Sequence, residues 1–340
     1  WNSSGTILAS ASPVGAKLWS TDMNYSSSHT LREITILNHS SSKPIDRVRF
    51  HPREEPLLCS SGEDQAVQLW DVRERQNNGA AGRIKLKSKK SLVAASVEWH
   101  PQYASYLAVT EKDNSVHIYD VRKLKSMSAN TSSASANTGG TSETIKSFQF
   151  DHVLQETHFS PSGTHLVCAA RRVKDGMGII QVCPWEGENK TNDNSNTFTF
   201  VGHTGPIYSL SFSPDGTALA TGGNDALVGL WDVKSMTCQA TISNRTKFIR
   251  SVAFSYDSRV VACCSEEEGV DMTDPRSGEH IGTVSLSKGN DRDRGGNSRF
   301  GGGAGSDEIV FHPKAYILAC ARGQGISSQI PQVSIAKLRL

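Results

Sequence analysis

The sequence predicts an all-β protein, a seven-bladed β-propeller whose blades are four-stranded antiparallel sheets. Three observations support this architecture. An aromatic residue, a short polar turn and a small-residue apolar strand recur seven times along the 340 residues. Short alternating segments bounded by Pro, Gly and Asp are typical of strands, and no long apolar stripe with a 3.6-residue period indicates a helix. The aromatics that open the repeats are Trp1, Phe50, Trp99, Phe159, Phe212, Phe254 and Phe311.

The clearest repeat runs from Val201 to Val233, with Gly-His near its start and Trp-Asp near its end. We expect its strands over 207–212, 218–221, 227–232 and 238–242, with a tight turn at 213–216. A sequence pattern of this kind, repeated every ~40 to 50 residues, is typical of WD40 repeats. The sequence therefore predicts a single WD40 propeller domain over residues 1–340.

Successive repeats differ in length because polar stretches are inserted between strands. We expect flexible inserts near 125–144, 188–196 and 288–306, where added residues cost little stability. The first repeat lacks its opening strand and the last lacks an evident fourth strand. We therefore expect a strand preceding Trp1 to complete the last blade.

Composition narrows the functional classes. With 36% hydrophobic and 21% charged residues the chain can bury a large core. A net charge of +2 argues against a strongly basic, duplex-binding protein, and no apolar run is long enough to span a membrane. The seven cysteines lack metal-site spacing and are expected to be reduced core residues. With no phosphate loop or paired carboxylates either, we predict no catalytic residue, cofactor or metal.

Two repeats contain a set of four side chains that can lock a blade. In each set a His precedes the first strand, a Ser or Thr lies on the second, an Asp lies in the following turn, and a Trp lies on the third strand. Their polar groups can satisfy one another, which is the condition for burying them. The same residue types occur in hydrolase triads, but recurrence in two repeats indicates architecture. The sets are His203, Thr221, Asp225 and Trp231, and His39, Ser60, Asp64 and Trp70.

A candidate partner-binding surface lies where the loops before the first strands converge with the turns between second and third strands. Aromatic and Arg residues are favoured at binding hot spots. An ordinary, partly buried surface remains the alternative. The candidate residues are Tyr208, Asn224, Phe248, Arg250 and Lys112.

Two basic segments could instead contact RNA. Residues 83–90 alternate basic and apolar residues, which favours an outer strand whose lysines block edge pairing, with an RNA-backbone contact as the alternative. Residues 294–302 contain two Arg-Gly stretches of the kind that binds RNA weakly. Because only two such stretches occur, we favour a disordered spacer over an RNA contact for this segment.

The chain resembles the THO complex subunit 3 family. The resemblance rests on Asp225-Ala-Leu-Val-Gly-Leu-Trp-Asp-Val233, on 249–258, and on 307–314 with 317–321, while 1–12 and 68–73 fit the first two repeats. It implies a nuclear, non-enzymatic subunit of a complex that couples transcription to mRNA packaging and export. Such a subunit docks on a large helical scaffold subunit and meets RNA mostly through its partners. The resemblance implies no membrane and no small-molecule substrate.

A substrate receptor of a cullin–RING ubiquitin ligase is the competing hypothesis. Its motivation is the short Trp-Asp-x-Arg motif, present at Trp70-Asp71-Val72-Arg73 and, with Tyr in place of Trp, at Tyr119-Asp120-Val121-Arg122. Identification of the proteins that co-purify with the chain separates the two hypotheses.

Overall fold

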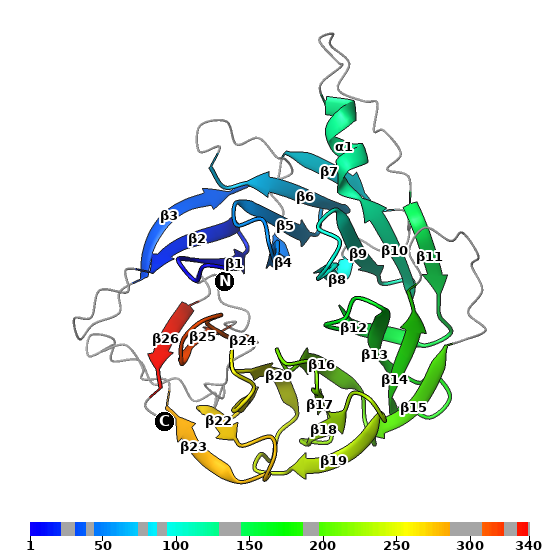
Figure 1. Cartoon of the computed structure of the whole chain (residues 1–340), viewed down its shortest axis with the longest axis vertical. Coiled ribbons are helices and arrows are strands. Elements are labelled where there is room, and N and C mark those ends of the chain that lie inside the picture. The colour runs from blue at the N-terminus through cyan, green and yellow to red at the C-terminus, as the bar shows by residue number, and fades with distance from the viewer. Residues whose placement is uncertain are drawn as a thin grey trace, which may run out of the picture. The chain divides into compact units, whose positions relative to one another are not determined.

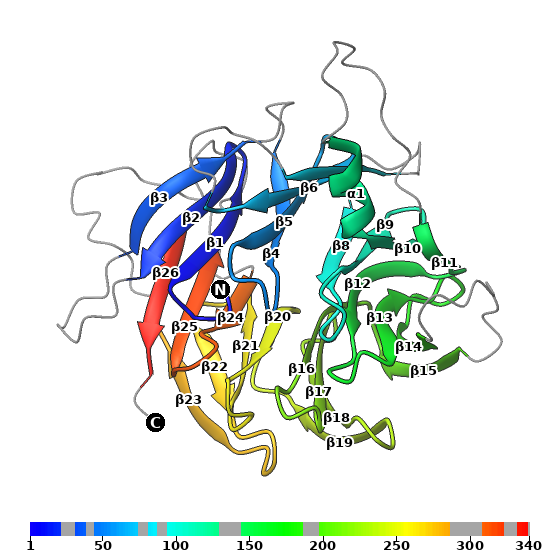
Figure 2. The same cartoon turned by 45° about the horizontal axis from the view of Figure 1, so that its top comes forward.

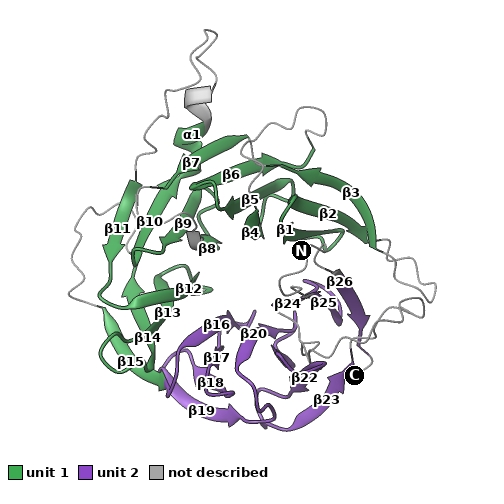
Figure 3. Cartoon of the chain, turned by 180° about the vertical axis from the view of Figure 1, so that it is seen from behind, with its two compact units in different colours: residues 1–202 green, residues 203–340 purple. Residues whose placement is uncertain are grey.

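The computed structural model describes residues 1–21, 31–38, 44–73, 81–86, 94–128, 144–185, 197–285, 308–322 and 332–338. Within them, consecutive strands pair into seven antiparallel sheets, shown in Figure 1. The chain divides into two compact units, Trp1–Gly202 and His203–Leu340, which are coloured separately in Figure 3.

The first unit contains four sheets, each with its strands in sequence order. Their strands are β1 (Ile7–Ser12), β2 (Gly15–Thr21) and β3 (Leu31–Leu37); β4 (Ile45–Phe50), β5 (Leu57–Gly62), β6 (Ala66–Asp71) and β7 (Gly82–Lys85); β8 (Ala94–Trp99), β9 (Tyr106–Glu111), β10 (Ser115–Asp120) and β11 (Thr144–Gln149); and β12 (Val153–Phe159), β13 (His165–Arg171), β14 (Gly178–Pro184) and β15 (Phe198–His203).

The second unit contains three sheets of the same kind. Their strands are β16 (Ile207–Phe212), β17 (Ala218–Gly223), β18 (Val228–Asp232) and β19 (Thr237–Ile242); β20 (Ile249–Phe254), β21 (Val261–Ser265), β22 (Val270–Thr273) and β23 (His280–Val284); and β24 (Glu308–Phe311), β25 (Ile317–Arg322) and β26 (Gln332–Lys337).

The seven sheets confirm the predicted all-β fold, a seven-bladed β-propeller with antiparallel blades. The strands expected in the clearest repeat match β16–β19 to within two residues. Five sheets have four strands, whereas the described residues of the first and last sheets provide three each. Completion of the last blade by a strand preceding Trp1 stays a prediction, as does the single domain over 1–340.

The core of each unit lies between neighbouring sheets. In the first unit, Leu69 and Ile84 of the β4–β7 sheet pack against Trp99 and Leu107 of the next sheet. The inner strands β4, β8 and β12 follow one another in both Figure 1 and Figure 2. Small or branched apolar side chains suit this close packing of one sheet against the next. The inner strands consequently carry side chains from different repeats into contact.

One helix, α1 (Val121–Ser128), follows β10 directly. Asp120 caps it, because Asp120 Oδ1 accepts a hydrogen bond from the Arg122 backbone N–H at 3.0 Å, and Leu124 packs against the neighbouring core. Within the flexible insert predicted near 125–144, residues 125–128 belong to α1 and Thr144 begins β11, and the flexibility of the insert stays a prediction. Residues 129–143, and the predicted inserts 188–196 and 288–306, lie outside the described residues.

Candidate functional site

The β16–β19 sheet brings His203, Thr221, Asp225 and Trp231 into one hydrogen-bonded chain. The Trp231 indole Nε1–H donates to Thr221 Oγ1 at 2.9 Å. Thr221 Oγ1 lies 2.7 Å from His203 Nε2, and His203 Nδ1 lies 2.9 Å from Asp225 Oδ1. The Thr204 backbone N–H also donates to Asp225, at 3.0 Å. The carboxylate therefore ties the start of the blade to the turn after β17.

The Asp225 carboxylate can only accept hydrogen bonds, and this fixes where the hydrogens lie in the hydrogen-bonded chain. Because ionised Asp225 can only accept, His203 must carry a hydrogen on Nδ1, and in the neutral imidazole Nε2 is then an acceptor. Thr221 can therefore give its hydroxyl hydrogen to His203 while accepting from Trp231. Burial alone would raise the pKa of Asp225, but the hydrogen bonds from His203 and two backbone N–H groups hold that pKa below its usual value.

Three members of the quartet, His203, Thr221 and Trp231, are buried, and Asp225 is partly buried. Thr221 is 0% exposed. Two glycines make room for the set: a Cβ on Gly229 would lie 2.8 Å from Trp231 Nε1, and one on Gly223 would collide with the His203 ring. A catalytic hydroxyl must reach a substrate, whereas this one holds two strands together.

The second predicted set is only partly within the described residues. The Trp70 indole N–H donates to Ser60 Oγ at 2.7 Å, as in the first set. Asp64 forms an ion pair with Arg83 at 3.4 Å. His39 lies outside the described residues, so its role stays a prediction.

Two partial counterparts of these sets escaped the sequence analysis. In the first sheet, the Trp19 indole N–H donates to Ser10 Oγ at 2.9 Å. In the β20–β23 sheet, Arg245 stands nine residues before Phe254, the offset that His203 has from Phe212. Counting from the strand aromatic, rather than requiring a His before the first strand, would have found both.

Arg245 replaces the histidine with a buried ion cluster. Its guanidinium donates to the carbonyls of Glu268 and Gly269 at 3.1 and 3.0 Å, and its Nε pairs with Asp271 at 2.6 Å. Glu267 takes the place of the turn Asp and accepts from Thr246. A buried charge requires this degree of pairing, so the blade keeps the same link between loop and turn with different chemistry.

The structure brings four of the five candidate partner-binding residues together. The rings of Tyr208 and Phe248 lie 5.8 Å apart, and Tyr208 Oη donates to Asn224 Oδ1 at 3.3 Å. The Arg250 guanidinium stacks on Phe248 at 4.4 Å and pairs with Glu266 at 2.8 Å. Arg250 and Asn224 are exposed, and both rings are half-buried. These residues form an exposed aromatic and arginine cluster on adjacent sheets.

Lys112 belongs to the other unit and is not part of this cluster. It is exposed in the turn between β9 and β10. Burial and the charge of Glu63 raise the pKa of nearby Asp46, and the positive charge of Lys112 opposes that rise.

The remaining motifs are placed as follows. Both Trp-Asp-x-Arg-type arginines fold back on their own aspartates, Arg73 on Asp71 at 2.6 Å and Arg122 on Asp120 at 2.7 Å. In the basic segment 83–90, residues up to Lys85 belong to β7, the last strand of its sheet, and 87–90 lie outside the described residues. The Arg-Gly segment 294–302 lies outside them as well.

A charged cluster connects the inner strands of three sheets. His158 on β12 lies 3.2 Å from Glu98 on β8 and 3.3 Å from Glu156, and Arg49 on β4 approaches both carboxylates at 3.9 and 3.8 Å. Burial alone would lower the pKa of His158, but the two carboxylates raise it to about 10. His158 is therefore protonated at neutral pH and joins strands that are far apart in sequence.

Two neutral histidines connect the turns that follow these inner strands. His51 Nε2 lies 2.7 Å from the Ala104 carbonyl, and His100 Nε2 lies 2.9 Å from the Gly163 carbonyl. Each Nδ1 accepts backbone N–H groups of its own turn, so Nε2 carries the donated hydrogen. Burial lowers the pKa of both His51 and His100. Both histidines therefore have the same tautomer, with the hydrogen on Nε2, and each uses it to hydrogen-bond the turn of the next sheet.

The described residues also bear on metal, disulfide and membrane sites. No three His, Cys, Asp or Glu side chains there gather as a metal ion would require. All seven cysteines are unbridged thiols, and six of them are buried. No helix in that part of the chain is long and apolar enough to cross a bilayer.

Comparison with known proteins agrees with the fold. The WD domain, G-beta repeat family matches residues 194–232 and 236–272. The chain is 23% identical to WD repeat-containing protein AAC3 of Dictyostelium discoideum, over 98% of this chain and 63% of that protein, so it spans less than two thirds of that relative. It is also 23% identical to THO complex subunit 3 of Arabidopsis thaliana, over 83% of this chain and 76% of that protein. Protein TEX1 of Saccharomyces cerevisiae is 24% identical over 39% of this chain and 30% of its own length. The chain therefore contains WD40 repeats on a β-propeller fold and, as predicted, is similar to THO complex subunit 3.

Proposed function

We propose that this chain is a non-catalytic docking subunit of a THO/TREX-type complex in the nucleus. In this role residues 1–340 act as one propeller domain that binds other protein subunits, foremost a large helical scaffold subunit, while mRNA is packaged and exported. RNA is met through those partners. The similarity to THO complex subunit 3 over 83% of the chain supports this choice.

The observation that carries the proposal is the cluster of Tyr208, Phe248 and Arg250. Phe248 lies between the other two, with the Arg250 guanidinium 4.4 Å and the Tyr208 ring 5.8 Å from its ring, and Glu266 pairs with Arg250 at 2.8 Å. These contacts hold the side chains in place before a partner arrives. Preordered aromatic and arginine side chains lose little conformational freedom on binding and dominate the energy of many interfaces. In the polar quartet of the same unit, the Thr221 hydroxyl is fully buried, so the exposed cluster is the better functional site.

The test is affinity purification of the tagged full chain from nuclei, followed by mass spectrometry. We expect the double variant Phe248→Ala/Arg250→Ala to recover ~30-fold less of its THO partners, since hot-spot truncations cost about 2 kcal/mol or more. The matched control is Tyr256→Ala/Arg259→Ala, an exposed aromatic and arginine at the other end of β20.

The control variant should keep its partners, and both variants should melt within a few degrees of the wild type. Equal recovery of THO subunits by both variants would remove the cluster from the interface. Recovery of a cullin adaptor without THO subunits would favour the ubiquitin-ligase hypothesis instead.

A further inference from the structure

The outermost strand of the fourth sheet has one side open to another chain. β15 is the last strand of the β12–β15 sheet, and Figure 1 shows it outermost in that sheet. It pairs with β14, and no other described strand pairs with it. Alternate backbone N–H and C=O groups along the open side of such a strand can therefore form hydrogen bonds with an added strand.

No charged side chain protects this edge. Proteins commonly block open edges with charged residues, because these residues oppose pairing with another strand. The outer strands β3 and β7 follow this rule, with the exposed side chains of Arg32 and Arg83. Residues 197–203, in contrast, contain no Asp, Glu, Lys or Arg. The same is true of β19 and β23, so a second property must distinguish β15.

Exposed apolar side chains provide that distinction. Phe198 is 58% exposed and Val201 is 43% exposed, and the ring of Phe198 lies 5.6 Å from that of Phe200. Among the other described outer strands, a large apolar side chain is exposed only on β23, at Ile281. β15 is thus the described outer strand that combines an uncharged edge with two neighbouring aromatic rings.

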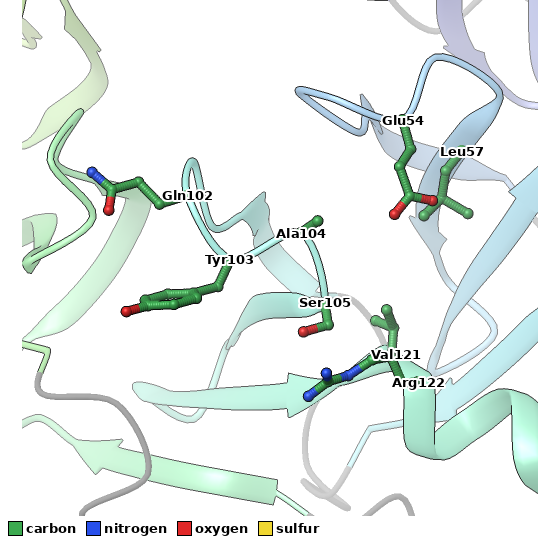
Figure 4. Close-up of a pocket in the computed structure, with 8 residues that line it drawn as sticks. All are labelled: Glu54, Leu57, Gln102, Tyr103, Ala104, Ser105, Val121 and Arg122. Atoms are coloured by element: carbon green, nitrogen blue, oxygen red, sulfur yellow. The ribbon is translucent and has the colours of Figure 1, made fainter.

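The two other exposed aromatic side chains of the described residues lie in turns. Tyr103 packs against His100 at 4.9 Å and Tyr106 at 5.6 Å. Figure 4 shows its ring directed away from the opposite wall of a cavity of about 330 Å³. Tyr256 packs against Tyr316 at 5.2 Å. Each of these rings is held by neighbouring aromatic rings, and neither lies along an open strand edge.

We propose that β15 pairs antiparallel with β15 of a second copy of this chain, which joins two sheets edge to edge. A second copy fits because both sides of the contact then have the same open edge, the paired strands contain no like charges, and the exposed apolar side chains of each copy cover those of the other. Such a two-fold contact is self-complementary. It is separate from the surface of Tyr208, Phe248 and Arg250 and does not depend on the function proposed for that surface.

The positions of the rings select one register. With Thr199 on the two-fold axis, Phe198 of each copy lies opposite Phe200 of the other. Directly opposite side chains lie on the same face of an antiparallel sheet, and aromatic pairs there stabilise the pairing. An axis moved by one residue in either direction leaves one aromatic pair instead of two. The favoured register also places Thr199 opposite Thr199 of the other copy.

The test is sedimentation velocity of the full chain between about 5 and 200 µM. A stable interface buries about 1,600 Å², and one pair of short strands buries much less, so we expect a dissociation constant on the order of 10–100 µM. The wild type should change from monomer to dimer across this range. Phe198→Lys, which removes one ring from each aromatic pair and brings two ammonium groups to the contact, should stay monomeric. The matched control is Ile281→Lys, on the uncharged outer strand β23, and it should dimerise like the wild type.

An introduced cysteine tests the register. Opposite Cα atoms of antiparallel strands are ~4.5–5.5 Å apart, a distance that a disulfide can span. Thr199→Cys should therefore form a covalent dimer in oxidised glutathione, whereas Val201→Cys, which lies opposite residue 197 of the other copy, should not. Both variants also carry Cys238→Ser, because Cys238 is the exposed native thiol.

Melting curves should show that every variant folds. The proposal is overturned if the wild type remains monomeric throughout this range, if Phe198→Lys dimerises as well as Ile281→Lys does, or if Val201→Cys forms as much covalent dimer as Thr199→Cys. The last result would mean that two copies meet without this pairing of strands.

Discussion

Replacing Thr221 with valine tests whether the buried hydrogen-bond chain stabilises the β16–β19 sheet. Valine has the same shape, so no cavity forms, but the Trp231 N–H and His203 Nε2 both lose the oxygen they contact at 2.9 and 2.7 Å. A buried polar group that loses its partner costs ~1–3 kcal/mol. Two such groups are affected, but the variant no longer has to bury the threonine hydroxyl, which offsets part of this cost. The expected loss in the free energy of unfolding is therefore about 2–4 kcal/mol.

Two control variants separate the hydroxyl from the methyl group and burial from exposure. Thr221→Ser keeps the hydroxyl and removes one methyl, so it should cost about 1 kcal/mol. Ser10→Ala breaks the equivalent bond to Trp19, which lies partly exposed in the first sheet. Water can replace that partner, so the cost there should be smaller than for Thr221→Val.

The assay is urea unfolding at pH 7.5, followed by tryptophan fluorescence and circular dichroism. The expected order of stability is wild type, then Thr221→Ser, then Thr221→Val, with the last two separated by at least ~1 kcal/mol. If Thr221→Val were as stable as Thr221→Ser, the hydrogen-bond chain would not stabilise the blade, and its description as an architectural lock would be wrong.

Two pH dependences follow from the histidines of the first unit. The pKa of His158 is raised from 6.5 to about 10, so its contribution to stability is complete below pH 6.5 and is lost as the pH rises through 10. His158→Gln should lower the free energy of unfolding by ~3 kcal/mol at pH 7 and should remove this loss of stability at alkaline pH. The measurement is the urea midpoint from pH 6 to 10. Midpoints that fall equally in the wild type and the variant would contradict this role of His158. His51 and His100 have lowered pKa values, so below pH 6.5 the unfolded chain takes up protons that the folded chain resists, and stability falls towards acid. The double variant His51→Ser/His100→Ser introduces serine, the residue that follows the strand aromatic at Ser160. It should reduce the fall in stability between pH 6.5 and 5. An unchanged pH dependence would assign the effect to other groups.

The repeat pattern alone was enough to locate the strands, because its signals are local. An aromatic, a turn with Pro, Asp or Gly, and an apolar strand follow one another within about twenty residues, and their order defines an antiparallel sheet. The match of β16–β19 to the expected ranges shows how strong that signal is. Helix α1 was missed because its signal is short: one capping Asp120 and eight residues at the edge of a polar insert.

Contacts between blades could not be inferred in this way. Glu98 and His158 are sixty residues apart, and only the packing of β8 beside β12 makes them an ion pair. Arg245 likewise showed its role only when Asp271 and the Glu268 and Gly269 carbonyls were seen around it.

The order of residues therefore specifies each blade of this protein, since hydrogen-bonded pairing between consecutive strands is a local property of the chain. The surface of Tyr208, Phe248 and Arg250 arises between repeats, where side-chain direction and packing decide which groups meet.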